Sequence, residues 1–148
     1  MGTRAIVRIF EKTEMGLEDN IVIYTQYDGY PEFFGKTLAE FSSAFYIVDV
    51  LENPEVKVAN GAGCFAAQLV CHLKKKPGNI YIYPSFHDVS GLEYTYDLIL
   101  KARKPVEINV YEIEESEEEA TEKEIFSGTC IDFLAWLKKD KVVQNNEN

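Results

Sequence analysis

Residues 60–84 hold the densest group of chemically active side chains in this sequence. A glycine-rich turn is followed by Cys64, Gln68, Cys71 and His72, and then by a tyrosine-rich stretch. The apolar spacing predicts a helix here, on which Gln68 and His72 lie one turn apart and share a face. Polar side chains on an otherwise apolar helix need partners, so this pair faces either a pocket or a polar surface stripe.

The turn before this helix predicts an anion-binding site. Gly61 and Gly63 match the G-x-G-x-x-A pattern of dinucleotide-binding turns, and the backbone N–H groups at a helix start favour phosphate. A complete dinucleotide-binding unit also needs a buried parallel strand before the turn and an acidic residue about twenty positions later. Tyr83 stands near that later position, and the segment before the turn is short and polar. The sequence therefore supports only the anion site.

Arginine and tyrosine side chains could complete this site. Arg4 and Arg8 lie on a predicted strand, and a guanidinium group matches the geometry of a phosphate. Tyr27 and Tyr81 could stack on a planar base. The predicted ligand-binding residues are Arg4, Arg8, Tyr27, Asp28, Gly61, Gly63, Gln68 and Tyr81. They predict a small, nucleotide-like anionic ligand, with no catalytic residue and no cofactor.

Cys64 offers an alternative chemistry. It lies in the first turn of the predicted helix, where the helix dipole favours a thiolate, so the chain could be a small thiol-dependent enzyme. His72 lies roughly 12 Å further along the helix, too far to act as the base, whereas His87 could approach from a loop. A buried, inert cysteine is the other interpretation. Cys64, Cys71, His72 and His87 do not have the spacing of a zinc site, so we predict no metal.

The composition predicts one acidic, soluble domain. A chain of 148 residues suits a single core, which we assign to residues 1–141, with a flexible tail at residues 142–148. The sequence has no long apolar run and no signal peptide, so we expect a cytoplasmic protein that does not bind a membrane. The net charge of −10 repels nucleic-acid backbones and argues against non-specific nucleic-acid binding.

The hydrophobic pattern predicts an α+β fold. Alternating apolar residues indicate strands at residues 3–12, 20–27, 80–83, 92–100 and 106–113. Apolar residues three and four apart indicate helices at residues 36–50 and 62–75, and a C-terminal helix follows the capping residue Thr129. We expect an antiparallel sheet, made of an N-terminal hairpin and a later meander, with two central helices and the C-terminal helix. The polar residues 11–20 and the acidic residues 114–122 are expected to be connections.

Four short motifs resemble, as a set, a group of small uncharacterised phage, viral and bacterial proteins. These motifs are G-T-R at residues 2–4, Q-Y-D-G-Y-P at 26–31, N-G-A-G-C followed by A-A-Q at 60–68, and P-G-N-I-Y at 77–81. The likeness covers roughly residues 2–98 and transfers no catalytic role. It implies a viral gene product that acts in the host cytoplasm, with interference with host defence as one role.

Two non-enzymatic functions follow from these observations. The first is an accessory protein that binds the nucleotide-like ligand described above. The second is a protein–protein interaction module that uses the loop at residues 27–31 and the acidic segment to bind a host or viral protein. A homodimer is compatible with either function.

Overall fold

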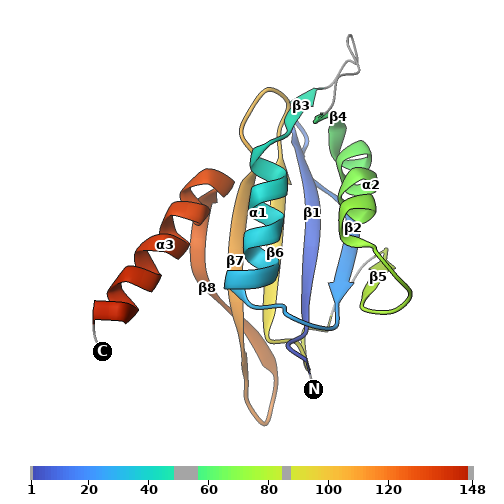
Figure 1. The fold of residues 1–148 in the computed structure, drawn as a ribbon. Coiled ribbons are helices and arrows are strands. Elements are labelled where there is room, and N and C mark those ends of the chain that lie inside the picture. The colour runs from blue at the N-terminus through green and yellow to red at the C-terminus, as the bar shows by residue number, and fades with distance from the viewer. Residues whose placement is uncertain (1, 49–56, 85–87, 147–148) are drawn as a thin grey trace.

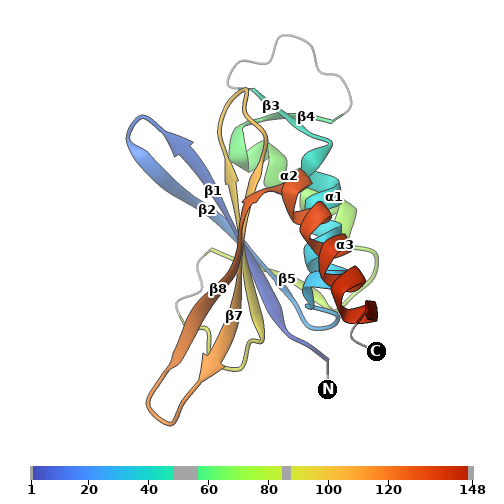
Figure 2. The same cartoon turned by 90° about the vertical axis from the view of Figure 1, so that its left-hand side faces the viewer.

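The computed structural model of the chain describes residues 2–48, 57–84 and 88–146. A six-stranded sheet with the order β5-β2-β1-β6-β7-β8 forms the centre, and β3 and β4 form a separate two-stranded ribbon. All three α-helices cover one face of the sheet (Figures 1 and 2). The predicted α+β class is therefore confirmed, with a mostly antiparallel sheet.

The elements have the following bounds. The strands are β1 Ala5–Thr13, β2 Gly16–Thr25, β3 Tyr46–Val48, β4 Val58–Asn60, β5 Ile80–Tyr83, β6 Tyr94–Leu100, β7 Glu107–Glu115 and β8 Ala120–Thr129. The helices are the π-helical turn η1 Pro31–Gly35, α1 Lys36–Ser43, α2 Gly61–Leu73 and α3 Cys130–Asn146.

The N-terminal hairpin forms as predicted, but it is longer than expected. Thr13 pairs with Gly16, so most of the polar residues 11–20 belong to β1 and β2 and do not form a connection. Gly16 has φ +113°, a conformation that glycine adopts without the strain of a side chain. The alternation of apolar residues identified the half of the hairpin that lies away from the turn. The half next to the turn is mostly polar, so the sequence pattern did not show that its residues pair.

The centre of the sheet is a parallel pair, which the sequence did not predict. β1 and β6 run in the same direction, with Ala5 opposite Tyr94 and Glu11 opposite Leu100. The two helices α1 and α2 lie between these strands in the chain, as parallel pairing requires. β6 and β7 form the expected antiparallel pair, and β8 adds to β7 as a further antiparallel strand.

Two boundary predictions are wrong for local reasons. α1 ends at Ser43 instead of residue 50, because the β-branched and aromatic residues of β3 pair with β4. The acidic residues 114–122 are mostly strand, since β7 continues to Glu115 and β8 begins at Ala120.

α3 begins where predicted, with the Asp132 N–H donating to Thr129 Oγ1 at 3.1 Å. It continues to Asn146, beyond the expected start of the tail.

The two faces of the sheet are different. Ala5, Val7 and Ile9 point toward the helices and join the main core, as their alternation predicts. Ile6 points to the other face, where it packs with Val22 and Leu92 in a smaller cluster. Leu92 lies before β6 and packs on this opposite face, whereas Tyr96, Leu98 and Leu100 of β6 join the main core.

Candidate functional site

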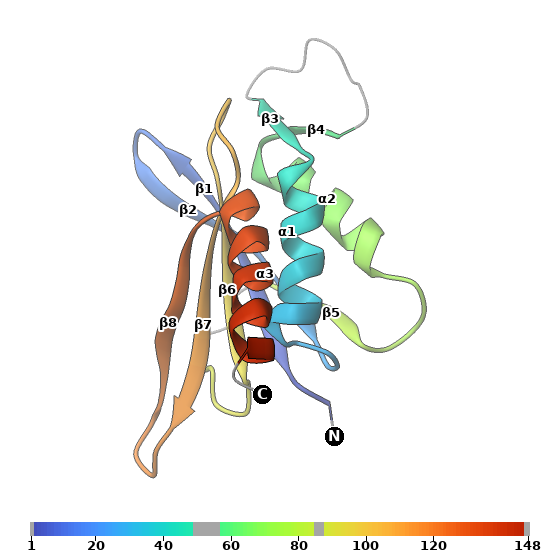
Figure 3. The ribbon, with the colours of Figure 1, turned by 60° about the vertical axis from the view of Figure 1, so that its left-hand side comes forward.

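A cleft lies between α1 and α2. Figures 1 and 3 show these two helices on the same face of the sheet. Its volume is ≈ 490 Å³, within the usual range for small-molecule sites. The residues that line it are Thr37, Glu40, Phe41, Ala44, Phe45, Lys57, Gln68 and His72.

Aromatic rings make up one wall of this cleft. The centroids of Phe41 and Phe45 are 4.6 Å apart, and the fully buried Phe65 lies 5.7 Å from the first and 5.5 Å from the second. The imidazole of His72 stacks on Phe41 at 4.8 Å with an interplanar angle of 27°. The wall therefore offers flat ring surfaces, which suit a planar ligand.

Gln68 and His72 both face this cleft, so the pocket interpretation of the pair fits the structure better than the surface stripe. The Nε2 group of Gln68 donates to the backbone oxygen of Val58 at 3.1 Å and lies 3.5 Å from Cys64 Sγ. These contacts orient the amide. Among the described residues none donates to its carbonyl oxygen, which remains an acceptor for a ligand.

Lys57 supplies a positive charge at the edge of the cleft. Its backbone has φ +70°, and its carbonyl accepts the Tyr46 N–H at 2.9 Å. This conformation is costly for a residue other than glycine, and such strain is concentrated at functional sites. No described residue pairs with the Lys57 ammonium group. The nearby Glu40 has a partner in Lys36, at 3.9 Å.

The predicted anion site at the start of α2 already holds a carboxylate from this chain. The Ala62 N–H donates to Glu11 Oε1 at 2.9 Å, and Gly61 has φ +79°. A Cβ atom at Gly61 would lie 2.8 Å from the same carboxylate oxygen. The two features that suggested a phosphate site, a glycine and a helix start, thus accommodate Glu11 from β1. Gly63 is exposed in the first turn.

Arg8 is engaged on the opposite face of the sheet, because its neighbours Val7 and Ile9 face the helices. Its Nε lies 2.5 Å from Asp97 Oδ1, and its Nη2 lies 2.8 Å from Glu122 Oε1. Burial alone would lower the pKa of Arg8, but the pairing with both carboxylates outweighs it and the pKa is raised. Arg8 is therefore separated by the sheet from Gly61 and Gly63.

The remaining predicted residues lie elsewhere. Arg4 is exposed, and its carbonyl accepts the Glu93 N–H at 2.9 Å. Tyr27 is exposed, and its N–H donates to Asn79 Oδ1 at 3.1 Å. Asp28 has φ +57°, and its carbonyl accepts the Phe34 N–H.

Tyr81 is exposed on the edge strand β5. Of the eight predicted ligand-binding residues, only Gln68 therefore lines the cleft between α1 and α2. The structure does not bring the eight together in one site.

Sequence reasoning missed most of the cleft. Phe41 and Phe45 have helical spacing, which we interpreted only as a core pattern. Lys57 carries no sequence signal, because nothing in its neighbourhood predicts a left-handed lysine. The polar pair Gln68 and His72 was the available signal, and both residues line this cleft.

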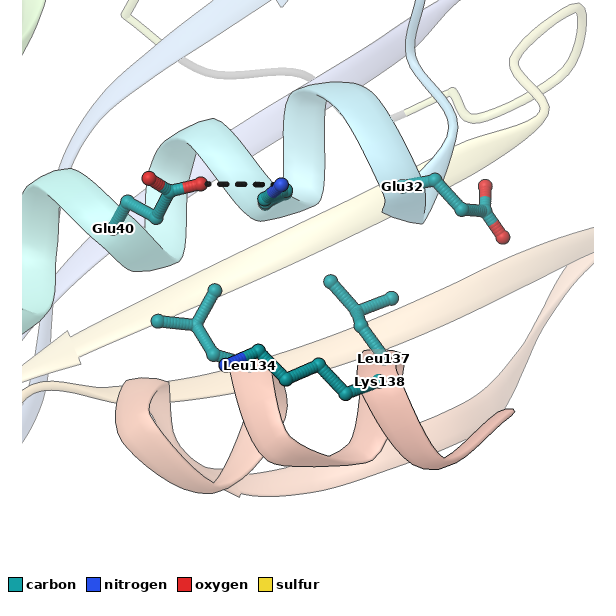
Figure 4. A pocket seen from close by; sticks show the side chains of 6 residues that line it. Glu32, Glu40, Leu134, Leu137 and Lys138 are labelled. Carbon is teal, nitrogen blue, oxygen red and sulfur yellow. Dashed lines mark ion pairs between the residues drawn. The ribbon is translucent and has the colours of Figure 1, made fainter. Parts of the chain in front are cut away.

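A second cleft, of ≈ 350 Å³, lies on the other side of α1, against α3 (Figures 3 and 4). Leu134 and Leu137 point from α3 toward α1, and the Lys36–Glu40 ion pair lies across from them. Its residues are Glu32, Lys36, Glu40, Leu134, Leu137 and Lys138. It has an aliphatic floor and no aromatic lining among the described residues, so it offers less specificity for a ligand.

The cysteines do not form a reactive site in the part of the chain that the structure describes. Cys64 is half-buried, Cys71 is exposed and Cys130 is buried. Burial raises the pKa of the Cys130 thiol to about 12, although Ser42 lowers it in part. The suggested partner of Cys64, His87, lies outside the described residues. No group of three or more metal-ligating side chains occurs in residues 2–48, 57–84 and 88–146.

We expect iodoacetamide to modify Cys71 first and Cys130 last in the native protein. Alkylation requires an accessible thiolate, and Cys130 has neither access nor a low pKa. Peptide mass spectrometry after timed exposure gives the order. Modification of Cys130 without unfolding would contradict this account, and faster modification of Cys64 than of Cys71 would support the thiol-enzyme alternative.

In the described part of the chain, no helix has the length and apolar character needed to cross a membrane. Comparison with protein family models, with curated proteins and with solved structures gives no significant match to this chain.

Proposed function

We propose that this protein binds a small planar ligand with an anionic group, of nucleotide-like chemistry, in the cleft between α1 and α2. The observation that carries the proposal is one cleft that combines an aromatic wall with the ammonium group of Lys57, which pairs with none of the described residues. The proposal keeps the ligand class that the sequence suggested. The proposed site lies on the face of α2 that carries Gln68 and His72, toward α1, and not at the start of that helix.

Each wall of the cleft has a distinct role in this proposal. The ligand ring lies against Phe41 and Phe45, where it replaces water on an apolar surface. The carbonyl oxygen of Gln68 accepts an N–H from the ring edge. Lys57 forms a charge-assisted hydrogen bond with the phosphate or carboxylate, and such bonds are about twice as strong as neutral ones.

Lys57→Met should weaken binding by about 1.5–3 kcal/mol, the range for a hydrogen bond to a charged group. Methionine keeps most of the apolar side chain and removes the ammonium group, so the melting temperature should change little. The measurement is calorimetric titration with adenosine monophosphate, cyclic adenosine monophosphate and benzoate.

The matched control is Lys123→Met, which removes an exposed lysine from β8 at one edge of the sheet. It should leave the affinity unchanged. Equal loss of affinity in both variants would indicate a general charge effect, and no binding of any probe at millimolar concentration would contradict the proposed function.

A further inference from the structure

The strand β5 presents apolar side chains at an edge of the sheet. Among the described strands it pairs only with β2, and its sequence is Ile-Tyr-Ile-Tyr, followed by Pro84. The exposed fractions of Tyr81, Ile82 and Tyr83 are 44%, 51% and 39%. Exposed apolar edge strands are uncommon unless they bind something or are protected from pairing.

The tyrosine rings at this edge form a row. Tyr81 and Tyr83 point to the face away from the helices, as does Tyr24 on the neighbouring strand. The ring of Tyr24 lies 6.1 Å from that of Tyr81 and 6.4 Å from that of Tyr83. We call Tyr24, Tyr81, Ile82 and Tyr83 the tyrosine edge.

The backbone of β5 is protected against the addition of a complete strand. The carbonyl of Ile80 accepts Lys74 Nζ at 2.9 Å, and the Ile80 N–H donates to Gly78 O at 2.8 Å. Both groups of Ile80 therefore point away from β2. Because hydrogen-bonded pairs alternate in antiparallel sheets, Ile82 is the next residue whose backbone groups point outward. Pro84 has no N–H to add, so a partner strand would gain few backbone bonds.

These features favour a ligand that is recognised by its side chains. A polyproline II segment makes no backbone ladder, and its prolines pack between aromatic ridges. Its three residues per turn and rise of about 3.1 Å per residue place side chains that share a face about 9 Å apart.

The positive charge next to β5 favours an acidic partner segment. Lys74, Lys75 and Lys76 are exposed and precede β5 directly, and Lys74 Nζ lies 5.5 Å from the centroid of the Tyr81 ring. This is a basic cluster in a chain whose net charge is −10. Acidic residues in the bound segment would complement the lysines.

We propose that the tyrosine edge docks an extended, proline-containing acidic segment of a partner protein. This binding activity is separate from the cleft between α1 and α2, and it does not depend on the proposed ligand. It also differs from the loop at residues 27–31 and the acidic segment, which the sequence suggested for protein binding.

The test is selection from a displayed library of random short peptides, followed by fluorescence anisotropy with a selected peptide. Proline and Asp or Glu should be enriched. Tyr81→Ala should weaken binding roughly 10- to 30-fold, as expected for an aromatic residue at the centre of an interface. Lys75→Glu should weaken it in a salt-dependent manner. The matched control is Tyr46→Ala, since Tyr46 is exposed on β3, in the separate two-stranded ribbon.

Three outcomes would overturn the proposal. The first is a selection without enrichment of proline and acidic residues. The second is equal binding of the selected peptides by Tyr81→Ala and the native protein, with circular dichroism showing that both are folded. The third is displacement of the peptide by single-stranded oligothymidylate at lower concentration than by unlabelled peptide, which would assign the tyrosine edge to nucleic acid.

Discussion

Phe65→Ala should lower the free energy of unfolding by about 3–5 kcal/mol, the usual cost of removing a buried phenylalanine ring. Phe65 is fully buried on α2, and its ring supports both Phe41 and Phe45. The lost ring would leave a cavity behind the aromatic wall of the cleft. Urea denaturation followed by circular dichroism measures the change.

Phe33→Ala is the matched control, because Phe33 is 58% exposed on η1. It should change the free energy of unfolding by no more than about 0.5 kcal/mol. A loss of no more than about 0.5 kcal/mol for Phe65→Ala would mean that Phe65 is not a core residue, and the position of α2 against the sheet would then be wrong.

Arg8→Met should lower the free energy of unfolding by about 2–3 kcal/mol at neutral pH, somewhat less than the cost of breaking a fully buried ion pair. Arg8 and Asp97 are each less than one-fifth exposed. Without the guanidinium group, the carboxylates of Asp97 and Glu122 would remain close together with no cation between them. Thr95 would still donate to Glu122, at 2.6 Å in the native protein.

The loss of unfolding free energy in Arg8→Met should be larger at neutral pH than at acidic pH. Burial raises the pKa of Asp97, Arg8 lowers it in part and Glu122 raises it. A carboxyl group whose pKa is raised on folding stabilises the fold below its unfolded pKa, and this contribution disappears as pH rises through the folded pKa. Arg8→Met raises the folded pKa further. The defect should therefore be larger at neutral pH than near about pH 4, the ordinary pKa of aspartate.

Denaturation of Arg8→Met and of native protein at both pH values tests this prediction. Arg4→Met is the control, since Arg4 is an exposed arginine shortly before β1. A defect that is the same at both pH values would show that Arg8 contributes through its aliphatic packing and not through the charge pairing.

Most of the fold could be predicted because its strands have one buried face. The alternation of Ala5, Val7 and Ile9, and of Tyr96, Leu98 and Leu100, identified the residues that pack against the helices. The parallel pairing of β1 with β6 could not be predicted, because alternation shows which face of a strand is buried and does not show which strand pairs with it. The charged ends of β2 and β7 also lacked an apolar signal, so both strands are longer than predicted.

The candidate site was harder to predict than the fold, because residue type does not reveal which groups already have partners. Arg8 and Gly61 are residue types that are common in phosphate sites. In the structure, however, Arg8 pairs with Asp97 and Glu122, and the carboxylate of Glu11 lies at the helix start beside Gly61. These carboxylates are distant in sequence from the groups they contact. Gln68 was identified because helical periodicity alone placed it beside His72.

The most direct test of the proposed cleft is a nuclear magnetic resonance titration of the isotopically labelled native protein with adenosine monophosphate and with benzoate. The account predicts saturable shifts in the side-chain signals of Phe41, Phe45, Gln68 and His72 with at least one of these probes. No shifts with either probe at millimolar concentration, or shifts confined to Gly61 and its neighbours at the start of α2, would contradict it.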